Sequence, residues 1–304
     1  FDWSWADAYQ RHGFAYYPKM LSAIPFTPAT GPRLCIKPGH DEDSIHGVLS
    51  EALLAHAESI DASSIHILFP PIEDKDKFKQ LGFKPRRGSQ YHWFNQGFTN
   101  FDDFLDTFSS RKRKNLKKER RKVQEQNLQL EVIEGPDISP QIWQRFYYFY
   151  QLTYAKRSGH GGYLNQEFFE LIATTMAEHI VLVLAYDNNK DGEAIAGAIN
   201  FRDSNTLYGR YWGCMVEYEF LHFEACYYQG IEYCIANHLQ RFDPGAQGEH
   251  KIQRGFTPIE TWSNHWISDQ AFGTAIDDFI DQDNRSMEAY IEQASEMLPF
   301  KKVE

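Results

Sequence analysis

Ionisable side chains are concentrated between residues 242 and 256, in the stretch FDPGAQGEHKIQRGF. Glu249, His250 and Lys251 are each able to move a proton, the first and last when burial shifts their pKa. Arg254 has the geometry to clamp a carboxylate or phosphate. If the segment is extended, Glu249 and Lys251 share one face and His250 lies on the other. We predict catalytic roles here, with a structural ion-pair network as the alternative.

A strand pattern, LYGRYWG, precedes this segment and places Tyr208, Arg210 and Trp212 on one face. A core strand rarely contains arginine unless the charge is paired or binds a ligand. We therefore predict that these three side chains contact substrate. The alternative is an arginine paired with a structural carboxylate such as Glu224 or Glu249.

A helix pattern follows at 221–238, with His222 and Glu224 in its first turn. The helix dipole favours an acid there, and His222 could reach a ligand beyond the helix N-terminus. Gln229 lies seven residues after His222 and so shares its face. These three residues and Arg254 complete the predicted substrate site, although capping and core contacts would explain the first turn equally well.

Metal binding has little support in the sequence. The candidate ligands would be His222, Glu224, Glu249, His250 and His265, but they show neither HExxH nor any other ligand spacing. We expect no metal.

Residues 111–122 hold nine basic residues and one acidic residue in a chain of net charge −11. Such density on one helix is unfavourable unless a polyanion neutralises it. RNA, a phosphorylated acceptor, an anionic membrane surface and self-association with the acidic body all remain open. The predicted polyanion-binding residues are Arg111, Lys112, Arg113, Lys114, Lys117, Lys118, Arg120 and Arg121.

Two similar orders of helices and strands occur along the chain. We predict an α/β (α+β) protein of two tandem domains, each with a mixed, mostly antiparallel sheet flanked by helices. The predicted boundaries are 1–99 for the first domain, 100–126 for a basic connecting helix, and 127–304 for the second domain with a helical tail. Strands are expected at 180–186, 193–201 and 206–213.

The composition limits the class of protein further. No segment approaches the length of an apolar membrane span. Four cysteines without CxxC spacing favour structural thiols in a reducing cytoplasm. Because the chain begins with Phe1 and not with methionine, we expect its first domain to be incomplete at the N-terminus.

Several long stretches resemble the FemAB-like group of predicted N-acyltransferases, relatives of the GNAT acetyltransferases. They are YYPKMLSAIPFTPATGPRL, SRKRKNLKKERRKV, LYGRYWG, LHFEACYYQGIEY and GAQGEHKIQRGF. The resemblance implies two tandem GNAT-like domains in a bacterial, cytoplasmic enzyme without a permanently bound cofactor. Its co-substrate would be an aminoacyl-tRNA or acyl-CoA, and its acceptor an amine.

The turn at 213–220 departs from the GNAT pattern, because it has one glycine, no arginine and two acids. It is a poor cradle for the pyrophosphate of CoA. Within an amine-attack mechanism, Glu249 or His250 would be the base and Lys251 or Arg254 the electrostatic stabiliser. Arg210, together with Tyr208 and Gln229, would orient substrate. The competing hypothesis is a non-catalytic binding protein on a GNAT-like scaffold, which recognises RNA or an anionic cell-wall ligand.

Overall fold

A computed structural model describes residues 3–159, 161–189, 192–246 and 248–302. The chain divides into two compact units: residues 1–90 with 259–296 form unit 1, and residues 91–258 with 297–304 form unit 2. Each unit is a mixed sheet with helices, as predicted. The assignment of residues 259–296 differs from the prediction, which placed them in the second domain. They belong to unit 1 because strand β9 (Thr257–Ile267) pairs antiparallel with strand β2 (Ser64–Leu68).

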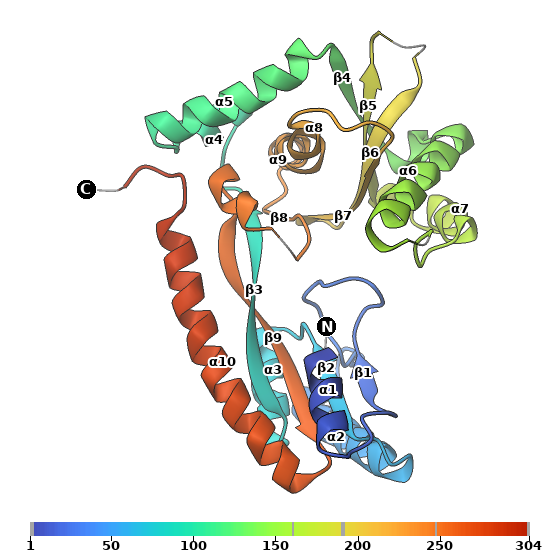
Figure 1. The fold of residues 1–304 in the computed structure, drawn as a ribbon, viewed down its shortest axis with the longest axis vertical. Helices are drawn as coiled ribbons and strands as arrows, with labels where there is room; N and C mark the ends of the chain where they lie inside the picture. The colour runs from blue at the N-terminus through green and yellow to red at the C-terminus, as the bar shows by residue number, and fades with distance from the viewer. Residues whose placement is uncertain (1–2, 160, 190–191, 247, 303–304) are drawn as a thin grey trace. The chain divides into compact units, whose positions relative to one another are not determined.

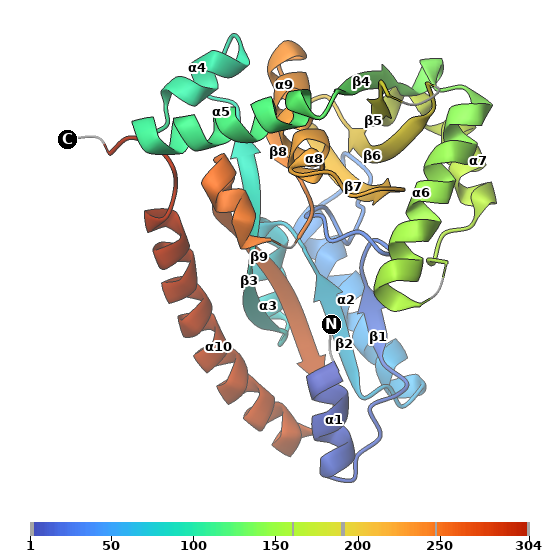
Figure 2. The same ribbon diagram turned by 45° about the horizontal axis from the view of Figure 1, so that its top comes forward.

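Unit 1 has the strand order β1-β2-β9-β3, in which β1 and β2 are parallel. Ile65 and Ile67 of β2 pack with helices α2 and α3, whereas His66 faces Trp5 of α1. Helix α10 runs alongside β3 (Figure 2), and Arg86 and other basic side chains of β3 form ion pairs with it. The elements not yet bounded are α1 (Trp3–Arg11), β1 (Met20–Ser22), α2 (Glu42–Ser59), α3 (Ile72–Gln80), β3 (Lys84–Phe94) and α10 (Gln270–Glu296).

Unit 2 has the strand order β3-β8-β7-β6-β5-β4. Only β7 and β8 are parallel among its paired strands, and the other described pairings are antiparallel. Its elements are α4 (Phe101–Asp106), α5 (Ser110–Glu125), β4 (Leu128–Glu134), α6 (Pro140–Ser158), α7 (Gln166–Thr175), β5 (Ile180–Asp187), β6 (Ala194–Arg202), β7 (Thr206–Cys214), α8 (Leu221–Phe223), α9 (Gln229–Ala236) and β8 (Arg241–Asp243).

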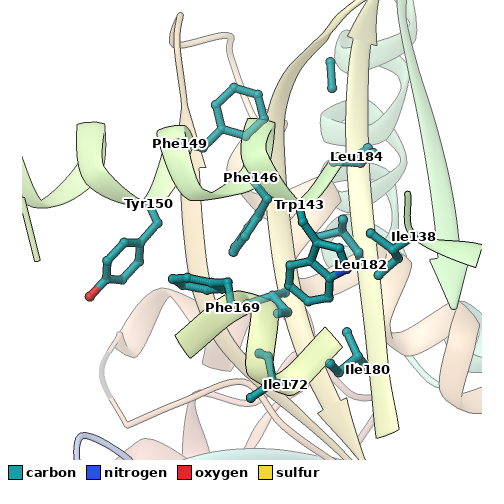
Figure 3. Packing of buried hydrophobic residues seen from close by; sticks show 12 residues of the cluster. Ile138, Trp143, Phe146, Phe149, Tyr150, Phe169, Ile172, Ile180, Leu182 and Leu184 are labelled. Atoms are coloured by element: carbon teal, nitrogen blue, oxygen red, sulfur yellow. The ribbon is translucent and has the colours of Figure 1, made fainter. Parts of the chain in front are cut away.

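Helices cover both faces of the unit 2 sheet, with α6 and α7 on one side of β5–β7 and α8 and α9 on the other (Figure 1). Strand β5 supplies both cores: Leu182 and Leu184 pack with the aromatic rings of α6 and α7 (Figure 3), whereas Val183 packs with Ala225. A strand buried on both faces has a nearly continuous apolar sequence, and IVLVLAY is such a run.

The close approach of α6 to β7 requires glycine at position 213. A Cβ atom there would lie 2.1 Å from the carbonyl oxygen of Phe149. Thr153 of α6 donates a hydrogen bond to the Trp212 carbonyl at 2.9 Å and fixes the same contact. Strand β7 is therefore held against α6 just beyond the residues predicted to bind substrate.

Two general properties accompany this fold. None of the helices in the described part of the chain has the length and apolar character needed to cross a bilayer. The four cysteines are free thiols, and Cys226 and Cys234 lie in the helical region 221–236, where burial raises the pKa of both thiols.

Candidate functional site

A cavity of about 80 Å³ opens where β7 and β8 separate. The two strands pair only from Thr206 to Tyr208, and β8 ends at Asp243 while β7 continues. Among the described residues, β7 has no pairing with β8 beyond Tyr208, and Gly209 and the residues after it line the opening. We call this the split cavity; its lining includes Asn200, Gly209, Arg210, Tyr211, Trp212, His222, Cys226, Tyr227 and Pro244.

Arg210 stands at an irregularity of β7. The β6–β7 register shifts between Ile199 and Asn200, which pair with Tyr211 and Gly209, so Arg210 is the extra residue of a bulge. Its Nη2 lies 3.4 Å from Oδ2 of Asp243, and both side chains are buried. The alternative considered for Arg210, pairing with a structural carboxylate, therefore occurs, but the carboxylate is Asp243 at the end of the neighbouring strand and not Glu224 or Glu249, the examples given.

Asp243 is a central residue that the sequence analysis missed. Besides Arg210, its carboxylate accepts a hydrogen bond from the Gly245 amide at 2.8 Å and lies 3.7 Å from Nε2 of His92. Its side chain is 2% exposed. The signal in the sequence was an acid at the end of a strand, directly before Pro-Gly.

Residues 249–254 form a 3-10 helix, so the extended conformation considered in the sequence analysis was wrong. Glycines at both ends, 248 and 255, have positive φ and close the segment into a compact turn. Glu249 is exposed at its start and lines neither the split cavity nor the cavity beside it. The shared face of Glu249 and Lys251 is lost.

Lys251 is 1% exposed, and its Nζ donates hydrogen bonds to the carbonyls of Gly245 at 2.6 Å and Pro244 at 3.3 Å. Burial lowers the pKa of Lys251 to about 8, although Asp243 opposes the shift. The lysine lines neither cavity. It clamps the Pro244–Gly245 segment that borders the split cavity, and its predicted catalytic role stays a prediction.

A second cavity, of about 260 Å³, lies between α5 and the 3-10 helix. We call it the outer cavity; it is lined by Lys112, Asn115, Leu116, Glu119, Tyr228, His250, Gln253 and Arg254. Arg254 stacks 3.4 Å from the ring centroid of Phe223 and donates to Glu119 at 2.8 Å. That ion pair engages Nη2 of Arg254 internally, as the structural alternative anticipated, while leaving the residue at the cavity wall.

A π turn, Glu224–Tyr228, joins α8 to α9. An inserted π turn changes which residues share a helix face and often occurs at functional sites. Tyr227 lines the split cavity and Tyr228 lines the outer one. The Tyr227 hydroxyl lies 2.8 Å from Nε2 of His250. Tyr227 was also missed, because nothing in the sequence distinguishes it from its neighbour.

His222 lines the split cavity, as its predicted binding role requires. Burial, with His250 as the next contribution, lowers the pKa of His222 to about 4, so the ring is neutral at pH 7. Trp212 lines the same cavity, and its ring lies edge-on to His222. Tyr208 is outside this lining and donates instead to Asp203 at 2.8 Å.

Glu224 and Gln229 form a separate structural network. Arg120 donates to Glu224 at 2.8 Å and to Glu232 at 2.7 Å, and Gln229 donates to Glu224 at 2.8 Å. Burial opposes the charge on Arg120, but the two carboxylates outweigh it and raise its pKa. Neither Glu224 nor Gln229 lines the split or outer cavity. The network ties the basic helix α5 to α9.

The basic residues of α5 separate into two sets. Most bind side chains of unit 2, as Arg113 binds Asp106 and Lys117 binds Asp102. Three others are exposed and have no ion-pair partner in the described part of the chain, and their i, i+3, i+7 spacing puts them on one face. We call this set the basic stripe: Arg111, Lys114 and Lys118.

The C-terminal segment brings further positive charge to the start of α5. Phe300 forms a β-bridge with Phe108, and the Lys301 amide donates to the Thr107 carbonyl at 2.8 Å. Lys301 and Lys302 are both exposed. In the part of the chain that is described, no group of three or more His, Cys, Asp or Glu side chains is arranged to hold a metal ion.

Unit 2 is a mixed sheet that splits between two parallel strands and is covered by helices on both faces, which is the GNAT-like architecture, and unit 1 is a second mixed sheet with helices, in tandem with it. Within that class the chain belongs to the FemAB-like family, described as peptidoglycan biosynthesis/recognition, whose model matches residues 1–302. A search of curated proteins found no match.

Solved structures share the fold at low sequence identity. L-PGS from Bacillus licheniformis is 12% identical, with a TM-score of 0.54 over 86% of this chain and 80% of that one. FemX is 14% identical, with a TM-score of 0.51 over 84% and 85%. The C-terminal domain of a putative lysylphosphatidylglycerol synthetase from Agrobacterium fabrum is 12% identical, with a TM-score of 0.52 over 77% and 76%.

Proposed function

We propose that the chain is an N-acyltransferase that moves an acyl or aminoacyl group from an activated donor to an amine of a peptidoglycan precursor. The split cavity carries this proposal. It combines the end of the β7–β8 pairing, a buried arginine at a bulge, a neutral histidine and a tyrosine side chain at one point of the sheet. The family description, peptidoglycan biosynthesis/recognition, supports an acceptor from peptidoglycan synthesis.

The reaction needs an oriented carbonyl and a stabilised oxyanion. Arg210 is the cationic side chain in the lining of the split cavity, and its pairing with Asp243 fixes its direction before a substrate binds. Preorganised charge of this kind stabilises a developing oxyanion without rearrangement. We therefore assign the orienting and stabilising role to Arg210, with His222 and Trp212 as substrate contacts.

The turn between β7 and α8 supports an aminoacyl ester over acyl-CoA. Glu217 and Glu219 lie there, and Gln126, the residue directly after α5, binds both the amide and the carbonyl of Glu219. Phe220, directly before α8, is in the left-handed region. Two acids and a main chain already engaged by Gln126 disfavour a pyrophosphate at this turn.

The basic stripe fits a donor that carries phosphates. The large apolar residues of α5, Leu116 and Val123, are buried, so the helix offers charge without an apolar face for a bilayer interface. We propose that the stripe contacts the phosphate backbone of tRNA, while the acyl end of the donor occupies the split cavity. An anionic vesicle that competes with tRNA would contradict this choice.

The test is a transfer assay with two donors, tRNA charged with radiolabelled amino acids and radiolabelled acetyl-CoA. The acceptor is a muropeptide with a free amine, and products are identified by mass spectrometry. We expect transfer from charged tRNA, and a loss of about 100-fold in kcat/KM for Arg210→Gln, because one electrostatic stabiliser is removed. Asp283→Asn, in an ion pair of unit 1, is the matched control.

Three results would contradict the proposal in different ways. Transfer from acetyl-CoA alone would exclude the tRNA donor. Binding of muropeptide without turnover of either donor would identify a recognition protein. Full activity of Arg210→Gln would leave an acyltransferase with a different oxyanion site.

A further inference from the structure

The split cavity and the outer cavity are connected by a hydrogen bond between two side chains. Tyr227 lines the split cavity, His250 lines the outer cavity, and the Tyr227 oxygen lies 2.8 Å from Nε2 of His250. Tyr227 is 4% exposed, whereas His250 is an exposed residue. The pair therefore runs from a buried site toward solvent, as a proton path does.

The local backbone builds this pair from two unusual elements. The π turn places Tyr227 and Tyr228 against different cavities, and the 3-10 helix presents His250 to Tyr227. Gly248, at φ 113°, leaves no room for a side chain, because a Cβ atom there would lie 2.4 Å from Cε1 of His250. The His250 ring therefore packs directly against the backbone of Gly248.

We propose that Tyr227 and His250 form a proton relay for acyl transfer in the split cavity, in which Tyr227 is the catalytic residue that touches substrate and His250 stores the proton. This inference rests on the proposed function and adds the acid–base step that Arg210 cannot perform.

All protons of the transfer step move between the acceptor amine, Tyr227, His250 and the leaving oxygen of the donor. The amine lone pair forms the C–N bond as the C=O π pair moves onto the carbonyl oxygen, and the amine proton passes to the Tyr227 oxygen as the phenol proton moves to Nε2 of His250. When the tetrahedral intermediate collapses, the oxyanion pair re-forms the C=O bond and the electrons of the C–O bond to the leaving group go to the leaving oxygen. The proton on His250 then returns through Tyr227 to that oxygen, which gives an amide and a free hydroxyl.

The side chains around His250 suit a residue that holds a proton only briefly. Partial burial, Arg254 and Lys251 lower the pKa of His250, so the ring begins neutral and returns its proton readily. Burial raises the pKa of Tyr227, so the phenol is protonated at the start of the cycle. The other charged or titratable groups near His250 come from α8, the π turn, α5 and its own segment, and they are His222, Tyr228, Lys112, Glu119 and Glu249.

The experiment measures kcat against pH for the wild type, Tyr227→Phe, His250→Gln and the double variant, with charged tRNA and muropeptide. We expect each single variant to lose about 100-fold in kcat, the lower range for general acid–base catalysis. The double variant should lose no more than either single one, because the two residues act as a unit. The change of kcat with pH that reflects ionisation of His250 should be absent from both single variants and from the double variant.

Two further measurements separate the relay from a packing role. Tyr233→Phe removes a buried phenol of α9 that donates to Glu134 at 2.7 Å, and it should leave both kcat and the pH profile unchanged. Histidine NMR should show the pKa of His250 rising in Tyr227→Phe, because a bond that favours the neutral ring is lost.

Each result bears on the relay. An active wild type whose kcat is unaffected by Tyr227→Phe would refute the relay and leave the proposed function intact. An unchanged His250 pKa in that variant would refute it as well. A wild type that transfers nothing from either donor would refute the proposed function first, and the relay with it.

Discussion

Replacing Lys251 by methionine tests whether a desolvated lysine clamps the edge of the split cavity. Methionine keeps the length and apolar stem of the side chain but removes the ammonium group. It therefore also removes both hydrogen bonds, to the Gly245 and Pro244 carbonyls. The informative quantity is the pH dependence of the difference in unfolding free energy between wild type and variant, since the lost hydrogen bonds contribute to it at every pH.

The sign follows from the proton balance. The pKa of Lys251 falls from 10.5 to about 8 on folding, so between these values the unfolded chain binds more protons and wild-type stability rises with pH. The cost of the buried charge is about 3 kcal/mol at neutral pH. As the pH rises from 7 to 9.5, this cost falls by about 2 kcal/mol, because the folded-state lysine loses its proton. The wild type should gain that amount relative to Lys251→Met over this interval.

Urea unfolding followed by circular dichroism measures the difference at several pH values from 7 to 9.5. Cys226 and Cys234 also titrate there, with the opposite sign, but they are common to both proteins and cancel in the difference. Lys301→Met removes an exposed lysine and is the matched control. A wild-type-minus-variant difference that stays flat across the interval would refute a depressed lysine pKa and the clamp inferred from it.

Three other perturbations have defined outcomes. Gly213→Ala should lower the melting temperature severely, because its Cβ atom would lie 2.1 Å from the Phe149 carbonyl oxygen; Gly47→Ala, with open space around it, is the control in thermal melts. Arg120→Met should lower the free energy of unfolding in urea by about 3–5 kcal/mol, because it leaves the carboxylate of Glu224 buried without its arginine. A loss below about 1 kcal/mol, the value typical of exposed ion pairs, would contradict this. Changing all three residues of the basic stripe to glutamine should reduce the slope of log affinity for tRNA against log salt by about 2, at about 0.7 per phosphate contact, in filter binding.

The elements with a strong periodic or apolar signal were predictable from sequence. Strands expected at 180–186 and 206–213 occur at Ile180–Asp187 and Thr206–Cys214. The first of them is apolar throughout because helices cover both of its faces. The family and the tandem α/β architecture also follow from the sequence, since long motifs carry them.

Features that depend on long-range pairing were not predictable. The sequence placed the tail helix in the second domain, since nothing local states that β9 pairs with β2. For the same reason it could not show that Asp243, thirty-three residues away, would pair with Arg210. The conformation of residues 249–254 was missed because a six-residue segment between glycines is too short to show a period.

The charged segment at 242–256 combines two tasks that its composition could not separate. Lys251 and Arg254 are buried and engaged by main-chain carbonyls and by Glu119, so their charges fix the shape of the segment. His250, directly before Lys251, is exposed and reaches Tyr227. A side chain poised for proton transfer needs a rigid backbone around it, because hydrogen-bond geometry must hold through the reaction. The two buried cations that follow the histidine provide that rigidity, and Arg254 also donates a hydrogen bond to the His250 carbonyl at 2.7 Å.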